Sequence, residues 1–304
     1  MEWEVGLIES IQNNLGGFSK VFGKIFAFVG GEMGLILLVV IVMFCYKKEV
    51  GQKLALLVAA MHAWFAMIKA VVKRPRPYVE YPDRVKALAP AAPQAELTDV
   101  AAQGYSFPSM HSGSVTAAYF TLAREIKKRW FWILTFVLIL LVGFSRVVTA
   151  NHYPTDVLAG WALGFVVVGI FDLIVRFVRK EWVRSLILLA LTLPGLFFVR
   201  TEDYYTSLGL LVGAIAAIPF ERKFVNFQDT RNIWAMILRV IGAFAIYFGL
   251  NTLMKLPFGE EFLHSASLGA LLVRSVRYAV ILFVIMGIYP KVFPLFEKVG
   301  SKGK

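Results

Sequence analysis

Long apolar stretches alternate with short polar segments along almost the whole chain. A helix needs roughly 20 apolar residues to cross the bilayer core, and it satisfies its backbone polar groups internally. The stretches are continuous and lack the strict alternation of a membrane β-strand. We therefore predict an all-α, polytopic integral membrane helix bundle with about nine transmembrane helices, over 27–46, 53–72, 109–124, 130–149, 156–176, 183–200, 206–220, 233–255 and 265–290.

The N-terminal segment has a different pattern. Its apolar residues recur at steps of three or four, with polar residues between them: Val5, Ile8, Ile11, Leu15, Phe18, Phe22 and Ile25. This spacing is typical of an amphipathic helix lying in the membrane interface. We predict such a helix over residues 1–26. Glu2 and Glu4 stand where a secretory signal carries basic residues, so we expect no signal peptide here.

One polar connection, residues 73–107, is far longer than the others and is rich in Pro and Ala. Loops of this length in a compact chain are uncommon and are usually functional or disordered. We therefore expect this loop to contribute to function.

Composition supports the membrane class and excludes several others. The chain is 58% hydrophobic and 17% charged, with a mean hydropathy of +0.68. These values exclude an ordinary soluble domain and intrinsic disorder. The single Cys45 excludes a disulfide framework and a thiolate zinc cluster.

The net charge of +12 would suggest nucleic acid binding in a soluble protein. Here the excess lies in five alternate connections, at 47–53, 124–129, 176–184, 222–231 and 291–304. Basic loops mark the cytoplasmic side. We therefore expect no nucleic acid partner, and we expect the loop 73–107 to lie outside the cytoplasm. We also expect a multi-pass protein of the cell (inner) membrane, and its compact loops suggest a bacterial origin.

Three polar clusters fall at the outer ends of predicted spans. The first contains Lys69 and Arg76-Pro77, and the second is Pro108-Ser109-Met110-His111. The third contains Ser145-Arg146, His152 and Asp156. A single cluster would suit a membrane anchor, but the three share one side and depth. Together their histidines, cations, hydroxyl and carboxylate are the groups needed to handle a phosphate ester.

In order and internal spacing, these clusters resemble the tripartite signature of the type 2 phosphatidic acid phosphatase superfamily. The one departure is Met110, where the family usually has glycine; we expect it to alter the pocket's shape rather than to abolish activity. The resemblance extends over about residues 20–180. We therefore divide the chain into an interfacial helix at 1–26, a phosphatase core at 27–180, and additional transmembrane helices of unknown role at 181–304.

The resemblance implies a role for each matching residue. His152 is the nucleophile that attacks phosphorus, and Asp156 orients it and stabilises its developing positive charge. His111 is the general acid and base. The phosphate-binding residues are Lys69, Arg76, Ser109 and Arg146.

Positioned cations can supply the charge stabilisation that phosphoryl transfer requires, and no carboxylate cluster has the spacing of a magnesium site. We therefore predict metal-independent turnover without a cofactor. Four further cations are candidates for headgroup contacts: Lys73, Arg74, Arg274 and Arg277.

The leading hypothesis is a lipid-phosphate phosphatase acting at the extracytoplasmic face. The family implies phosphatidate, phosphatidylglycerophosphate or isoprenyl diphosphate as candidate substrates. The alternatives are phosphotransfer to a lipid or sugar acceptor and hydrolysis of a soluble sugar phosphate. A lipid transporter is the alternative of a different class, and assembly into a homo-oligomer is left open.

Overall fold

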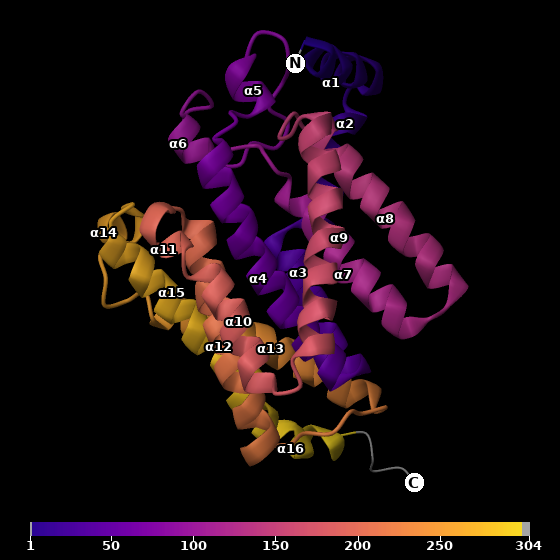
Figure 1. Cartoon of the computed structure of the whole chain (residues 1–304), viewed down its shortest axis with the longest axis vertical. Helices are drawn as coiled ribbons and strands as arrows, with labels where there is room; N and C mark the ends of the chain where they lie inside the picture. The colour runs from indigo at the N-terminus through magenta and orange to yellow at the C-terminus, as the bar shows by residue number, and fades with distance from the viewer. Residues whose placement is uncertain (1, 300–304) are drawn as a thin grey trace. The chain divides into compact units, whose positions relative to one another are not determined.

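The computed structural model describes residues 2–299, which form helices and connecting loops with no strand among them (Figure 1). The predicted all-α class is confirmed. The helices are α1 (Glu2–Leu15), α2 (Phe18–Gly30), α3 (Glu32–Ile41), the π-helical turn η1 (Val42–Tyr46), α4 (Lys48–Val72), α5 (Pro77–Glu80), α6 (Val100–Gln103), α7 (Met110–Ile126), α8 (Arg129–Val148), α9 (Pro154–Phe177), α10 (Glu181–Thr192), α11 (Gly195–Phe198), α12 (Glu202–Phe224), α13 (Ile233–Leu253), α14 (Glu260–His264), α15 (Leu268–Phe283), the π-helical turn η2 (Val284–Ile288), the 3₁₀ turn η3 (Tyr289–Val292) and α16 (Phe293–Glu297).

Seven helical segments of the described chain are long and apolar enough to cross a membrane: Lys48–Glu80, Arg129–Val148, Pro154–Phe177, Glu181–Phe198, Glu202–Phe224, Ile233–Leu253 and Leu268–Glu297. The pair Phe18–Gly30 and Glu32–Tyr46, bent by 47°, is an eighth candidate. The predicted third span corresponds to α7, whose 17 residues fall short of the roughly 20 that a span needs. The polytopic class is confirmed, whereas the count of nine is not.

The N-terminal segment forms two helices instead of the predicted single helix. The chain turns at Gly16, which has a positive φ of 51°, and α2 then belongs to the bent candidate span. Val5 and Ile8 of α1 are completely buried in a cluster with Tyr78 and Tyr153. The apolar side of α1 therefore packs on protein at these positions. A helix whose apolar face meets protein has the same sequence pattern as one that lies on lipid.

The described chain divides into two compact units. The first runs to Leu35 and includes Met67–Leu173, and the second takes Ile36–Ala66 and continues from Ile174. All three motif clusters fall in the first unit. Residues 36–66 group with the second unit, so these units do not follow the predicted boundary between 180 and 181. The functional division into core and additional helices stays a prediction.

In the first unit, α7 and α8 form an antiparallel hairpin on which α2 packs (Figure 1). Its turn at Lys127 and Lys128 carries the basic cluster that the sequence assigns to the cytoplasmic side. Ser109 and Arg146 lie at the other end of the hairpin, where α9 begins and α4 ends. The fold therefore brings the three motifs to one end of this unit.

The second unit depends on close helix contacts and one buried ion pair. A Cβ added to Gly209 of α12 would lie 2.1 Å from the carbonyl oxygen of Ser275 on α15. Small residues permit such close approach between membrane helices. At one end of α12, the fully buried Glu221 accepts a hydrogen bond of 3.1 Å from Lys48 of α4.

Candidate active site

The first motif lies where α4 ends and the long loop begins. Lys69, in the last turn of α4, donates from Nζ to the carbonyl oxygen of Tyr105 at 2.5 Å. Arg76 donates from Nε to the carbonyl oxygen of Gln103 at 2.8 Å and from Nη1 to that of Asn151 at 3.0 Å. Both cations are thereby positioned by backbone oxygens, two from the long loop and one from the connection between α8 and α9.

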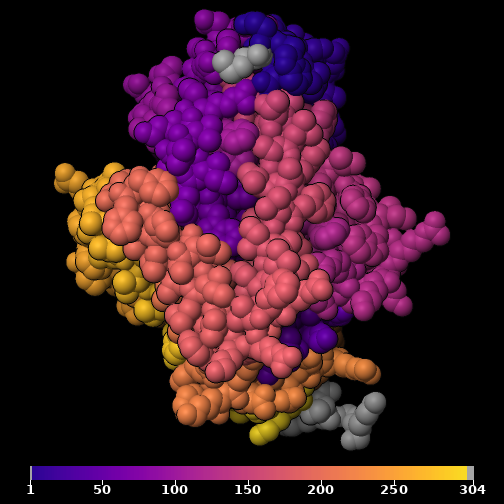
Figure 2. All heavy atoms as spheres, in the orientation of Figure 1, coloured from indigo at the N-terminus to yellow at the C-terminus, as the bar shows by residue number. Residues whose placement is uncertain are grey.

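The loop 73–107 is ordered around Gln103, which is only 1% exposed. Its amide donates to the carbonyl oxygen of Ala92 at 2.9 Å, and its side-chain oxygen accepts from Tyr78 Oη at 2.7 Å. The loop also contacts α1, because Gln12 donates to the carbonyl oxygen of Lys86 at 2.9 Å. Figure 2 shows the surface of α1 beside that of this loop.

The second motif begins α7. Ser109 is completely buried and caps the helix through its side chain. Its backbone N–H donates to the carbonyl oxygen of Asp156 at 3.0 Å, which connects the start of α7 with the start of α9. His111 is partly buried and lies beside the α2–α3 bend, where a Cβ added to Gly31 would be 3.5 Å from His111 Nε2. Met110 is the first residue of α7 and is also partly buried.

The third motif joins the end of α8 to the start of α9. Arg146 is 3% exposed and donates from Nη2 to the carbonyl oxygen of Gly23 at 3.1 Å. His152 is equally buried, and its backbone N–H donates to the carbonyl oxygen of Arg146 at 3.3 Å. Its Nδ1 lies 3.8 Å from Asp156 Oδ2 and has no hydrogen-bond partner in the described part of the chain. At this separation the carboxylate does not form a hydrogen bond with the imidazole.

Electrostatic interactions connect His152 with cations of the first and third motifs. Burial holds its pKa well below the usual value, and the positive charges of Lys69, Arg76 and Arg146 lower that pKa further. A lowered pKa keeps the imidazole neutral near pH 7, which is the state that can attack phosphorus. Lys69 and Arg76 belong to the first motif and Arg146 to the third, so the structure brings the predicted phosphate-binding cations of two motifs near the predicted nucleophile.

The four predicted headgroup residues have different surroundings. Lys73 is exposed at the end of α4, with a positive φ of 52°. Arg74 forms ion pairs with two carboxylates of the first unit. In the second unit, Arg274 pairs with Glu202 at 2.7 Å, and the buried Arg277 donates to Asn251 Oδ1 at 2.9 Å. Headgroup contact stays a prediction for all four.

Sequence reasoning did not assign roles to three residues that the structure ties to the site: Glu4, Gln103 and Asn151. Asn151 and Gln103 act on Arg76 through backbone oxygens, which any residue type possesses, so no residue pattern marks them. Glu4 does leave a signal. It is an acidic residue at the edge of the apolar face of the predicted amphipathic helix, beside Val5 and Ile8.

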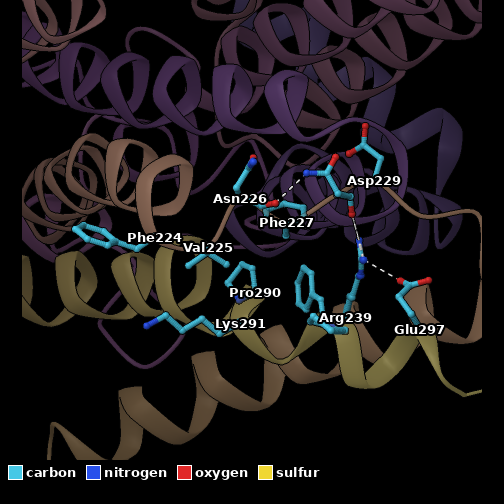
Figure 3. Close-up of a pocket in the computed structure, with 12 residues that line it drawn as sticks. Phe224, Val225, Asn226, Phe227, Asp229, Arg239, Pro290, Lys291 and Glu297 are labelled. Atoms are coloured by element: carbon cyan, nitrogen blue, oxygen red, sulfur yellow. Dashed lines mark hydrogen bonds and ion pairs between the residues drawn. The ribbon is translucent and has the colours of Figure 1, made fainter.

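The second unit also contains a cavity of about 650 Å³ (Figure 3). Arg239 in its wall is 2% exposed and donates to Glu297 Oε1 at 2.9 Å and to the carbonyl oxygen of Gln228 at 3.2 Å. Arg239 is therefore paired with two other residues of this wall. None of the lining residues belongs to the three motifs: Phe224, Val225, Asn226, Phe227, Gln228, Asp229, Arg239, Pro290, Lys291, Phe293, Pro294 and Glu297.

The structure is thus that of a polytopic helical membrane protein in which a buried histidine lies near a carboxylate and three cations. The model of the PAP2 superfamily matches residues 35–181, and that of the PAP2 superfamily phosphatase transmembrane extension matches residues 205–301. The chain belongs to the PAP2 superfamily and is a multi-pass membrane protein. No solved structure matches it.

Curated relatives match shorter segments. An undecaprenyl-diphosphatase of Sulfolobus acidocaldarius is 45% identical over 20% of this chain and 29% of its own length. A phosphatidylglycerophosphatase B of Bacillus subtilis is 36% identical over 25% of this chain and 44% of its own. A decaprenylphosphoryl-5-phosphoribose phosphatase of Mycobacterium tuberculosis is 36% identical over 36% of this chain and 53% of its own. The chain thus spans about half or less of these relatives.

Proposed function

We propose that the chain is a membrane phosphatase that hydrolyses phosphate monoesters or diphosphates of lipids at the extracytoplasmic face. One observation carries this proposal: three cations from two separate motifs act on one buried histidine that lies 3.8 Å from a carboxylate. The names of the relatives agree with it, since each is a phosphatase or diphosphatase, and all three names refer to a lipid-linked phosphate.

In this proposal the reaction proceeds in two displacements. Lys69, Arg76 and Arg146 hold the phosphoryl oxygens, with Ser109 as a further donor at the start of α7. His152 attacks phosphorus, the N–P bond forms, and the bond to the leaving oxygen breaks while His111 protonates that oxygen. Asp156 stabilises the positive charge on the phosphorylated imidazole. His111 then takes a proton from water, which attacks phosphorus and breaks the N–P bond.

The substrate test measures phosphate release by the detergent-purified protein in EDTA. The panel contains a polyprenyl diphosphate, phosphatidylglycerophosphate, phosphatidate and glucose 6-phosphate. We expect the lipid substrates to be hydrolysed in the chelator, because the three cations supply the charge stabilisation that a metal would otherwise provide. Loss of release in EDTA would contradict metal independence. Preference for glucose 6-phosphate would favour a soluble substrate, and transfer to an added acceptor without free phosphate would favour a phosphotransferase.

The orientation has its own test. A cysteine introduced at Ala95, in the long loop, should react with an impermeant thiol reagent in whole cells when Cys45 has been replaced by serine. The matched control is a cysteine at Lys128, in the basic turn between α7 and α8. We expect that control to react only after lysis, because basic loops face the cytoplasm. The reverse pattern would place the site on the cytoplasmic face.

A further inference from the structure

Glu4, on the N-terminal helix α1, is a buried carboxylate that accepts three hydrogen bonds in the site region. It is 3% exposed. Oε2 accepts from Arg74 Nη2 at 2.8 Å, and Oε1 accepts from the Thr155 N–H at 3.1 Å and from Thr155 Oγ1 at 2.7 Å. A buried charge is tolerated only when it is paired and hydrogen-bonded. Glu4 therefore has a fixed position over the first turn of α9.

Arg74 connects Glu4 to the predicted catalytic carboxylate. Its Nη1 donates to Asp156 Oδ1 at 2.7 Å and to Thr155 Oγ1 at 2.8 Å, and its guanidinium lies 3.8 Å from the centre of the Tyr153 ring. The second oxygen of Asp156, Oδ2, accepts from the Tyr153 N–H at 2.8 Å. Both oxygens of Asp156 are thus held, and Oδ2 is the one directed toward His152 Nδ1.

Other residues of α1 also contact the first unit. Val5 and Ile8 are completely buried against Tyr78 and Tyr153. Gln12, two turns further on, donates to the carbonyl oxygen of Val148 at 2.9 Å. Glu4 is therefore presented to Arg74 by a helix packed on the same elements that carry the motifs.

The net charge of the group around Asp156 shows what Glu4 contributes. Arg74 and Asp156 alone would form a neutral pair, which is poor at stabilising a cation on the adjacent imidazole. With Glu4 included, the group Glu4, Arg74 and Asp156 carries a net charge of −1. That charge faces a histidine otherwise surrounded by the cations Lys69, Arg76 and Arg146.

We propose that Glu4 is a positioning residue of the active site: by sharing Arg74, it fixes Asp156 and leaves one negative charge to stabilise the phosphorylated His152. This inference rests on the proposed function. It makes α1 part of the catalytic unit, and it gives Arg74 a role in orienting Asp156 in place of a headgroup contact.

Glu4→Gln tests the inference, because the substitution keeps the size of the side chain and removes its charge. We expect kcat for the best lipid substrate to fall between about 10-fold and 100-fold, less than the roughly 10⁴-fold lost when a triad carboxylate itself is altered. KM should stay within about 2-fold, because the phosphate-binding cations are unchanged. Glu2→Gln is the matched control: Glu2 lies on the same helix but is largely exposed and pairs with Arg84.

The pH profile separates this role from a purely structural one. The charged groups near His152 are the cations Lys69, Arg76 and Arg146 and the group formed by Asp156, Arg74 and Glu4. Removing a negative charge lowers the pKa of His152 further. The acid limb of kcat/KM should therefore move to lower pH in Glu4→Gln, whereas ionisation of the substrate is common to both enzymes and cancels in the comparison.

Glu4 also satisfies an N–H group in the first turn of α9, so a helix-capping role is the competing explanation. Capping alone predicts a lower melting temperature with unchanged kcat and an unchanged pH profile, and that result would overturn the proposal. If Glu4→Gln does not fold, Glu4→Asp decides instead: lower kcat at unchanged KM supports the proposal, and unchanged kcat overturns it. Wild-type turnover independent of His152 would instead contradict the proposed function.

Discussion

His152→Ala should lower phosphate release by roughly 10⁴-fold to 10⁶-fold in kcat, the range seen when a nucleophile or its partner is removed from a catalytic triad. The expected loss is large because alanine leaves no atom that can form the N–P bond. Lys69, Arg76 and Arg146 still bind phosphate in the variant, so KM should change far less than kcat. The measurement is phosphate release from the best lipid substrate under saturating conditions.

Two comparisons make this result specific. His264→Ala changes an exposed histidine in the second unit and should leave kcat unchanged. Brief incubation of the wild type with ³²P-labelled substrate, followed by quenching in alkali, should trap a phosphoryl group that is released by acid, as a P–N bond requires. A variant at His152 that retains a tenth of the wild-type rate would exclude a phosphohistidine at this position.

Much of the architecture follows from the apolar runs alone. A continuous run of about 20 apolar residues has few stable states other than a membrane helix, and α8, α9 and α13 lie close to their predicted ranges. The bend at Gly31 and the short α7 could not be predicted this way. Both depend on tertiary contacts: α7 is mostly buried in protein, and a helix covered by protein need not match the thickness of a bilayer.

The candidate site, too, could be predicted only in part from the sequence. The structure places the predicted cations and Asp156 near His152. Within each motif the spacing in the sequence limits how far apart these side chains can lie. The groups that hold these side chains in place could not be predicted from the motifs. The carbonyl oxygens of Tyr105 and Gln103 belong to a loop whose course depends on the buried Gln103 amide. Glu4 lies 148 positions before His152 in the printed sequence, and only the fold brings their groups together.

Gly160→Ala is the second substitution for which we expect a large loss of activity, because it changes the distance between α7 and α9. A Cβ added there would lie 2.5 Å from the carbonyl oxygen of Ser109 and 3.1 Å from Ser112 Cβ. The first of these is a backbone atom, so Gly160→Ala must push the two helices apart. That movement strains the bond between the Ser109 N–H and the carbonyl oxygen of Asp156, which fixes the second motif relative to the third.

Small displacements of catalytic groups lower the reaction rate strongly, since a displacement of about 1 Å can reduce it by roughly 10²-fold. We expect Gly160→Ala to lower kcat/KM by about 10-fold to 100-fold and to destabilise the protein by about 1 to 3 kcal/mol, as overpacking does. Gly169→Ala is the matched control on α9, because a Cβ there meets nothing within 4 Å. Alanine in an open helix position adds helix propensity, so this control should melt no lower than the wild type. Equal activity in the two variants would mean that the contact between α7 and α9 does not set the geometry of the site.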